Sequence, residues 1–263
     1  MTYGQDPSAF DAGYHQNYGN YANAAPGPQP LPPGKFDAIR SLEQGWRIFA
    51  EKPGGWIGSA AVYMGIFFVG YLASYFSLIF IFTSRIDEET GEFDGSNMSW
   101  GIIAALAAVL VISIIAALIW ELVTVREAVY AVGGKKPEFK DFFTFRRCGV
   151  LFLMLIVVGL LATLGMFALI IGMFVVAFFF MFAMFAIVFE DMSIGSALKT
   201  SYTVAKENVG QTLLLWLLTS IINGIGGSFI FGVLLTGPLC YIAIAHAYMT
   251  ATGRPVSERR ARS

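Results

Sequence analysis

The feature that most constrains the fold of this chain is an apolar run of 41 residues, 149–189, that contains no charged side chain. As a single α-helix it would be about 60 Å long, since each residue adds about 1.5 Å. The hydrocarbon core of a bilayer is only about 30 Å thick. The run therefore predicts two membrane-spanning helices joined by a very short turn, which we expect near Gly165–Gly172.

Other apolar segments approach or exceed the length of about 20 residues that a spanning helix needs. They are residues 57–82, 101–125, 210–223 and 228–250, of which the third is short and is followed by the sequence GIGG. Charged residues make up 13% of the chain, about half the usual share in soluble domains, which is roughly 25%. The sequence thus predicts an all-α, polytopic membrane helix bundle with six transmembrane helices.

The distribution of basic residues predicts the orientation of these spans. Lys and Arg concentrate on the cytoplasmic side of inner-membrane proteins. With six spans and a cytoplasmic N-terminus, sixteen of the seventeen basic residues fall in cytoplasmic segments, and the exception is Arg85. The first external loop instead carries five acidic residues between positions 87 and 94. We therefore expect both termini in the cytoplasm.

An amphipathic helix is expected before the first span, because apolar residues recur at helical spacing among charged ones. These apolar residues are Phe36, Ile39, Leu42, Trp46 and Phe49. Such a helix would lie in the membrane interface. Residues 193–210 repeat this arrangement before the fifth span, and the segment from Pro137 to Arg147 precedes the third with Phe139, Phe142 and Phe143 on one side.

Two spans end in the same way. Tyr130 is followed by Lys136-Pro137, and Tyr248 is followed at identical spacing by Arg254-Pro255. We expect both tyrosines to be aromatic anchors at the inner interface, and each basic-Pro pair to supply charge and a helix stop. This structural role explains the motif; a binding role is the alternative.

Together these features predict a membrane domain over residues 36–255, built from three units of about 36–137, 138–192 and 193–255. Each unit would be an interfacial helix followed by two spans. Residues 1–35 are rich in Pro, Gly, Tyr and Asn and have few aliphatic side chains, so we expect a disordered cytoplasmic tail. It would be a spacer or a docking arm. Residues 256–263 form a basic cytoplasmic tail.

The expected span interiors hold no Asp, Glu, Lys or Arg, which argues against an ion-coupled transporter or pump. Glu121 is the best candidate for a functional carboxylate, and we expect it at headgroup depth, paired with Arg126 or a neighbouring basic residue. His15 and His246 are the only histidines, and clustered carboxylates are absent, so we expect no catalytic residue, cofactor site or metal site. The net charge of -1 gives no reason to expect a nucleic-acid partner.

Several residues remain as candidates for function or lipid contact. Pro238 should kink the sixth span, since proline removes a helix hydrogen bond, and His246 is expected to be an interfacial or a helix-packing histidine. Small residues four apart predict close helix contacts in the first two spans, at Ala61/Gly65, Gly70/Ser74, Ala104/Ala108 and Ser113/Ala117. The full set of candidates is Glu121, Arg126, Tyr130, Trp46, Pro238, His246 and Tyr248.

The last unit carries Ala197, Leu198, Lys199 and Ser201 in a helix, then a span, then a span with Pro238 that ends in Ala-x-x-Tyr at Tyr248. This pattern resembles a poorly characterised group of bacterial six-span membrane proteins. It is also similar to the membrane domain attached to some glycerophosphodiester phosphodiesterases, whose catalytic domain has no counterpart here. The resemblance implies a bacterial cytoplasmic membrane and no established active site.

Three functions are compatible with these features. The first is a non-enzymatic integral membrane protein that supports envelope or membrane processes by binding lipids or partner proteins. The second is a permease or flippase for an uncharged or amphipathic small molecule or lipid, because transporters are often built from internal repeats. A membrane-embedded enzyme is the third, and it lacks the clustered carboxylates or nucleophile–base pair that it would need. A packed bundle favours the first, and a continuous polar cavity favours the second.

Overall fold

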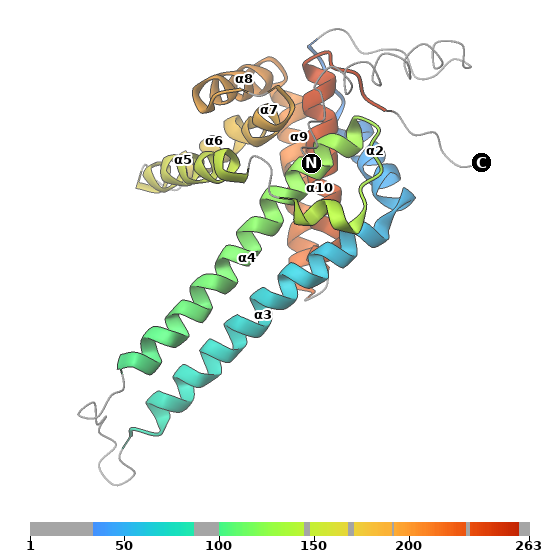
Figure 1. Ribbon diagram of the computed structural model, residues 1–263. Helices are drawn as coiled ribbons and strands as arrows, with labels where there is room; N and C mark the ends of the chain where they lie inside the picture. Colours follow the sequence, from blue (N-terminus) through green and yellow to red (C-terminus); the bar gives the residue numbers. More distant parts are fainter. Residues whose placement is uncertain are drawn as a thin grey trace, which may run out of the picture. The chain divides into compact units, whose positions relative to one another are not determined.

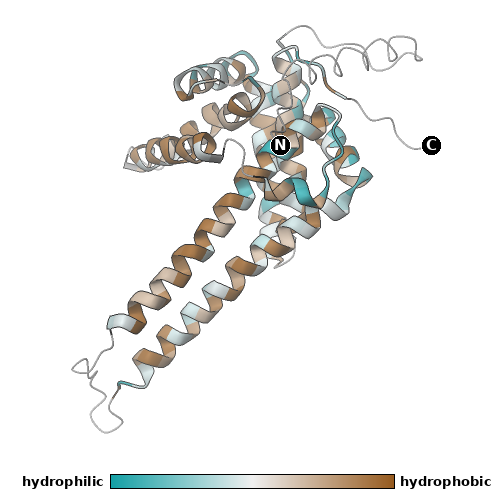
Figure 2. Cartoon of the chain, viewed as in Figure 1, coloured by the Kyte–Doolittle hydropathy of each residue, from teal (hydrophilic) through white to brown (hydrophobic). Residues whose placement is uncertain are grey.

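The structure is a computed structural model, and it describes residues 34–86, 100–144, 148–167, 171–190, 192–229 and 232–257. The acidic loop and nearly all of the two expected tails lie outside the described residues. Regular structure in the described part is helical, and six of its helical segments are long and apolar enough to cross a membrane. The prediction of an all-α, multi-pass membrane protein is confirmed (Figures 1 and 2).

The first helices in the described part are α2 (Ala38–Glu51), α3 (Pro53–Thr83), α4 (Trp100–Val132) and the short 3-10 helix η1 (Phe139–Phe143). They are followed by α5 (Cys148–Phe167), α6 (Ile171–Phe180), α7 (Ala183–Glu190), α8 (Ile194–Glu207), α9 (Val209–Ser228) and α10 (Val233–Ala251). The six spans are α3, α4, α5, α6 together with α7, α9 and α10. The ends of α5 and α6 fall within the predicted turn, and residues 168–170 between them lie outside the described part.

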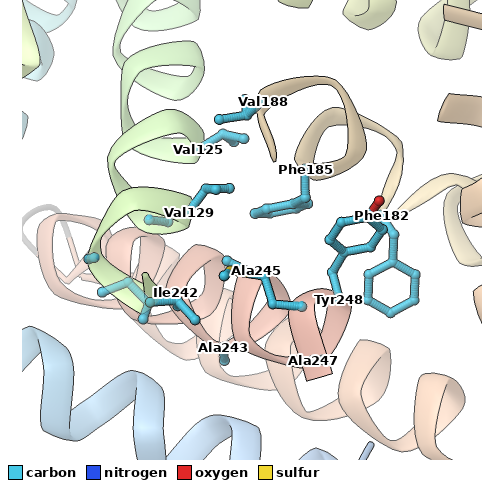
Figure 3. Close-up of a cluster of buried hydrophobic side chains, with 14 of the residues drawn as sticks. Val125, Val129, Phe182, Phe185, Val188, Ile242, Ala243, Ala245, Ala247 and Tyr248 are labelled. Atoms are coloured by element: carbon cyan, nitrogen blue, oxygen red, sulfur yellow. The ribbon is translucent and has the colours of Figure 1, made fainter. Parts of the chain in front are cut away.

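Helix α10 is the central element. It packs on α2, α4 and α9, and also on α3 and α7. In the most apolar 18-residue stretch of α10, 56% of the residues are buried, whereas in the corresponding stretches of α3 and α4 only 11% are buried. Figure 3 shows how valines of α4, Phe185 of α7 and alanines of α10 meet in this core. Alanine on α10 allows neighbouring helices to approach closely.

Helices α3 and α4 form a hairpin whose contact depends on small residues. Gly70 lies so close to Ser113 that a Cβ at position 70 would overlap the Ser113 hydroxyl. Farther along, the Ser74 hydroxyl donates to the Leu106 carbonyl over 3.1 Å. Four predicted contact positions behave differently, because Ala61, Ala104 and Ala108 are exposed and a Cβ on Gly65 would meet nothing within 4 Å.

The fourth span is broken between α6 and α7, at Met181 and Phe182. A helix break in an apolar setting exposes backbone groups that need partners. Ser201 of α8 supplies them, since its hydroxyl donates to the Phe179 carbonyl (2.8 Å) and accepts from the Phe182 amide (3.2 Å). Helix α8 is thereby joined to the middle of the fourth span, Ile171–Glu190.

The boundary between the last two spans differs from the prediction. The sequence GIGG, residues 224–227, lies inside α9, which continues to Ser228, and α10 begins only at Val233. The prediction that the sixth span begins at Ser228 was therefore wrong. Gly226 permits the close return of the chain, because a Cβ there would collide with Thr236.

Helices α4 and α10 end in the same hydrogen-bond pattern, shifted by one residue relative to their tyrosines. In α4 the amide of Lys135 bonds to the carbonyl of Tyr130, and Gly134 has φ +104°. In α10 the amide of Arg254 bonds to the carbonyl of Met249, and Gly253 has φ +68°. These are Schellman ends, which favour glycine in the left-handed region. Lys135, not Lys136, is thus the structural counterpart of Arg254.

The segments before the first and third spans also differ from expectation. In α2 the buried face is made of small and polar residues together with Ile48 and Phe49, whereas Ile39 and Trp46 are exposed. Before α5, the expected amphipathic helix is reduced to η1, and residues 145–147 lie outside the described part. The ring of Phe142 packs edge-on against Trp56, with centroids 5.0 Å apart, so this segment covers the start of α3.

Candidate functional site

The charged side chains of the spans lie toward one end of the bundle, where α4 and α10 both end. The amide of Ser257, after α10, donates to the carbonyl of Val132, the last residue of α4 (2.8 Å). We call this region the polar end. The carboxylates of Glu121, Glu127 and Glu190 lie toward the polar end. The partners of each carboxylate show whether it is already paired within the chain or could bind another group.

Glu190 of α7 has a complete set of partners. The Tyr248 hydroxyl donates to its Oε1 over 3.1 Å, and the Arg254 guanidinium lies 3.6 Å from its Oε2. The guanidinium also lies 5.6 Å from the centroid of the Phe189 ring, within cation–π range. Tyr248 is fully buried. The expectation that it is an interface anchor like Tyr130 was therefore wrong, and the one-residue shift explains it, since one residue turns a helix by about 100°.

Glu127 and Arg126 form a buried pair at the end of α4, with side chains only 1% and 3% exposed. The guanidinium of Arg126 lies 2.9 Å from the Glu127 carboxylate, and Lys135 lies 3.2 Å from the other carboxylate oxygen. Arg126 also donates to the carbonyls of Asp141 (2.7 Å) and Thr144. These bonds satisfy both charges and hold the η1 segment against α4, which is a structural role.

Exposed ion pairs also hold the solvent-facing side of the η1 segment. Lys140 lies 3.0 Å from Glu138, and Lys52 at the start of α3 lies 3.6 Å from it. The hydrogen bond from Lys140, followed by its charge, lowers the pKa of the Glu138 carboxyl, and the same contact raises the pKa of Lys140. Because both groups are exposed, water and salt screen this interaction.

Glu121 is different from the other two carboxylates. It accepts a hydrogen bond of 3.1 Å from the hydroxyl of Tyr241 on α10. Among the described residues, no Lys or Arg forms an ion pair with it. The expectation that it pairs with Arg126 was wrong, because Arg126 is committed to Glu127 and to two carbonyls. Glu121 also lies five residues before Arg126, about 7.5 Å deeper along α4.

His246 joins α10 to α2. Its Nδ1 lies 3.1 Å from the hydroxyl of Ser41, and that hydroxyl donates its one hydrogen to the Asp37 carbonyl (2.8 Å). The Nδ1 of His246 must therefore be the donor to Ser41, which fixes the tautomer. Next to this bond, Gly45 faces α10, and a Cβ there would lie 3.1 Å from backbone atoms of Leu239 and Ala243. His246 thus packs between α10 and α2.

Comparison with known proteins gives a plain result. No family model, no curated protein and no solved structure matches the chain. The arrangement of side chains is therefore the basis for any functional conclusion.

The remaining candidates lie apart from one another. Trp46 is 57% exposed on the outer side of α2, with its ring 6.1 Å from Phe49. Tyr130 is half-buried, and the Lys135 ammonium lies 5.4 Å from its ring. Pro238 is buried inside α10, which continues through it as one helix. The adjacent Gly237 leaves room for the Trp120 ring, 3.0 Å from where a Cβ would be.

Sequence reasoning missed Tyr241, Glu127 and Ser201 as polar partners. A usable signal existed for Tyr241, since it lies seven residues before Tyr248, two turns along the same side of α10. The described residues contain no group of three or more His, Cys, Asp or Glu side chains that could hold a metal ion. What the region offers chemically is charge pairing and hydrogen bonding, with Glu121 as the carboxylate that has no cation in the described structure.

Proposed function

We propose that this chain is a non-enzymatic integral protein of the bacterial cytoplasmic membrane that supports envelope or membrane processes by binding lipids or partner proteins. The observation that carries this proposal is the contrast between α10 and the other spans. Helix α10 is enclosed by its neighbours, and its Tyr241, His246 and Tyr248 side chains bond to partners in the same chain. The apolar flanks of α3 and α4 remain exposed over most of their length.

The arrangement of polar groups favours binding over transport. A permease or flippase for an uncharged or amphipathic molecule needs polar groups that follow one path through the bundle. Here Tyr241, His246 and Tyr248 point to three different helices, α4, α2 and α7, and each forms a separate local bond. Such bonds stabilise a packed bundle and leave the outer surface as the place where other molecules bind.

Orientation and the interfacial helices belong to the same proposal. The concentration of basic residues supports a cytoplasmic polar end and cytoplasmic termini. The exposed Ile39 and Trp46 on α2, opposite its packed face, support contact with lipid at the interface. The matching ends of α4 and α10 support the correspondence between the first and third units, with α2 and α8 as corresponding helices.

Native mass spectrometry would test this function on the full chain, extracted from its own membrane directly into lipid nanodiscs. We expect either a lipid class or a protein to remain bound at fixed stoichiometry. Trp46→Ser should weaken a lipid bound at α2, while Val69→Ser is the matched control, since Val69 is exposed on α3 far from α2 in sequence. Bulk lipid alone, without any stoichiometric lipid or protein, would contradict the proposal.

A further inference from the structure

Glu121 stands out when the three carboxylates near the polar end are compared. Glu127 has Arg126 and Lys135 as cationic partners, and Glu190 has Arg254. Among the described residues, Glu121 has one neutral partner, the Tyr241 hydroxyl. An ionised carboxylate accepts about four hydrogen bonds, and an ionisable group at membrane depth is stabilised by a partner of opposite charge. The structure therefore leaves one carboxylate of this set incompletely satisfied.

A second copy of this chain is a poor source of the missing cation. The apolar runs predicted as spans, one of which includes Glu121, contain no Lys or Arg, so the spans of a second copy offer no cation from within these runs. Arg126 is the nearest basic residue along α4, but it is buried and bonds to the Glu127 carboxylate and to two backbone carbonyls. Because no described Lys or Arg of this chain pairs with Glu121, we look for its cation in another molecule.

The side of α4 that leads to Glu121 is open and apolar. Positions 100, 104, 107, 111, 114, 118 and 121 follow the alternating spacing of four and three that places side chains on one seam of a helix. The first five are exposed, and Leu118 and Glu121 are half-buried. The neighbouring row, Ser113, Ala116 and Trp120, is buried inside the chain. Ala104 and Ala107 on the open seam permit close approach of another helix.

We propose that Glu121 and this seam of α4 form a docking surface for a transmembrane helix of another protein that carries a Lys or Arg at the depth of Glu121. The proposal rests on the proposed binding function and names the partner's chemistry. The apolar seam supplies the packing surface, the two alanines supply the close contact, and Glu121 supplies the opposite charge. The Tyr241 hydroxyl is a neutral partner within the chain, and it leaves the charge of Glu121 available to the partner helix.

A photo-crosslinking amino acid at Leu118, one turn from Glu121, tests this in the full chain in its native membrane. Mass spectrometry then identifies the crosslinked peptides. We expect a product with a transmembrane segment of another protein that has Lys or Arg within one turn of the attachment point. The yield should fall about tenfold in Glu121→Gln, the effect of losing one polar contact between membrane helices of 1–2 kcal/mol.

Tyr241→Phe is the control that separates a role in folding from a role in docking. If the Glu121–Tyr241 pair only stabilised the fold, Glu121→Gln would keep the hydrogen bond and leave the yield unchanged, whereas Tyr241→Phe would lower it. The docking proposal expects the reverse, because Tyr241→Phe keeps the charge. A partner segment without Lys or Arg, or an unchanged yield in Glu121→Gln, overturns the inference and leaves the binding function standing. Lipid as the only product at Leu118 also overturns it, and the nanodisc experiment decides the binding function separately.

Discussion

At the scale of single residues, the buried charges at the end of α4 are the most sensitive point of the structure. Removing the side chain in Arg126→Ala would leave the Glu127 carboxylate buried with only Lys135, and would free two backbone carbonyls. Breaking a buried ion pair from one side costs about 3–5 kcal/mol. We expect a loss of that size in the free energy of unfolding, measured in detergent micelles. Lys140→Ala removes an exposed cation from the same segment and should leave stability unchanged within error.

Ser201 provides a second residue-scale prediction. Its hydroxyl serves two backbone groups at the break between α6 and α7. Ser201→Ala would leave both without a partner in an apolar setting, at a cost of about 1–3 kcal/mol. Thr203→Ala is the matched control, because Thr203 is exposed on the same helix and bonds only within its own turn. Equal unfolding midpoints for the two variants would show that Ser201 does not stabilise the break.

At the scale of elements, the α3–α4 hairpin depends on one close approach. Gly70→Leu would force the helices apart at Ser113, and overpacking of this kind costs about 1–3 kcal/mol. Gly65→Leu adds the same volume on α3 where a Cβ meets nothing within 4 Å, so it should leave the unfolding midpoint in place. Similar destabilisation in both variants would mean that the hairpin does not pack through Gly70.

The elements also show where sequence reasoning succeeds and where it stops. Long apolar runs predicted all six spans, because length and hydrophobicity alone determine whether a helix can cross a bilayer. They did not predict the break at Met181–Phe182, since both sides of it are equally apolar and the partner, Ser201, lies 20 residues away along the chain. The GIGG sequence does not mark a boundary, because glycine is common inside membrane helices and these residues lie within α9.

The same limit applies to the candidate residues. The charge and position of Glu121 and Arg126 in the sequence marked both as candidate functional residues. The direction of each side chain, however, depends on helix packing. Arg126 turns toward the η1 segment and Glu121 toward α10, because five residues separate them by about 140° around α4. The matching ends of α4 and α10 were visible in the sequence, while the one-residue shift that buries Tyr248 required the cap geometry.

At the scale of the whole molecule, the orientation in the membrane can be tested directly. Basic residues surround the polar end, so we expect the η1 segment in the cytoplasm and the far end of α3 outside. In a background with Cys148→Ser and Cys240→Ala, Ser84→Cys should react with a membrane-impermeant maleimide in intact cells. Lys140→Cys should react only after the membrane is opened. Both positions are exposed, so equal labelling of the two variants in detergent controls for reactivity.

The opposite pattern would change the functional argument as well as the topology. If Lys140→Cys reacted in intact cells, the polar end and Glu121 would face outside, and the partner helix would need its Lys or Arg in the outer leaflet. Basic residues in spans are more favourable near the cytoplasmic surface, whose negative lipids attract them. A cytoplasmic polar end therefore agrees with a cationic partner for Glu121, and the labelling result tells at which end of the partner's helix the basic residue must be sought.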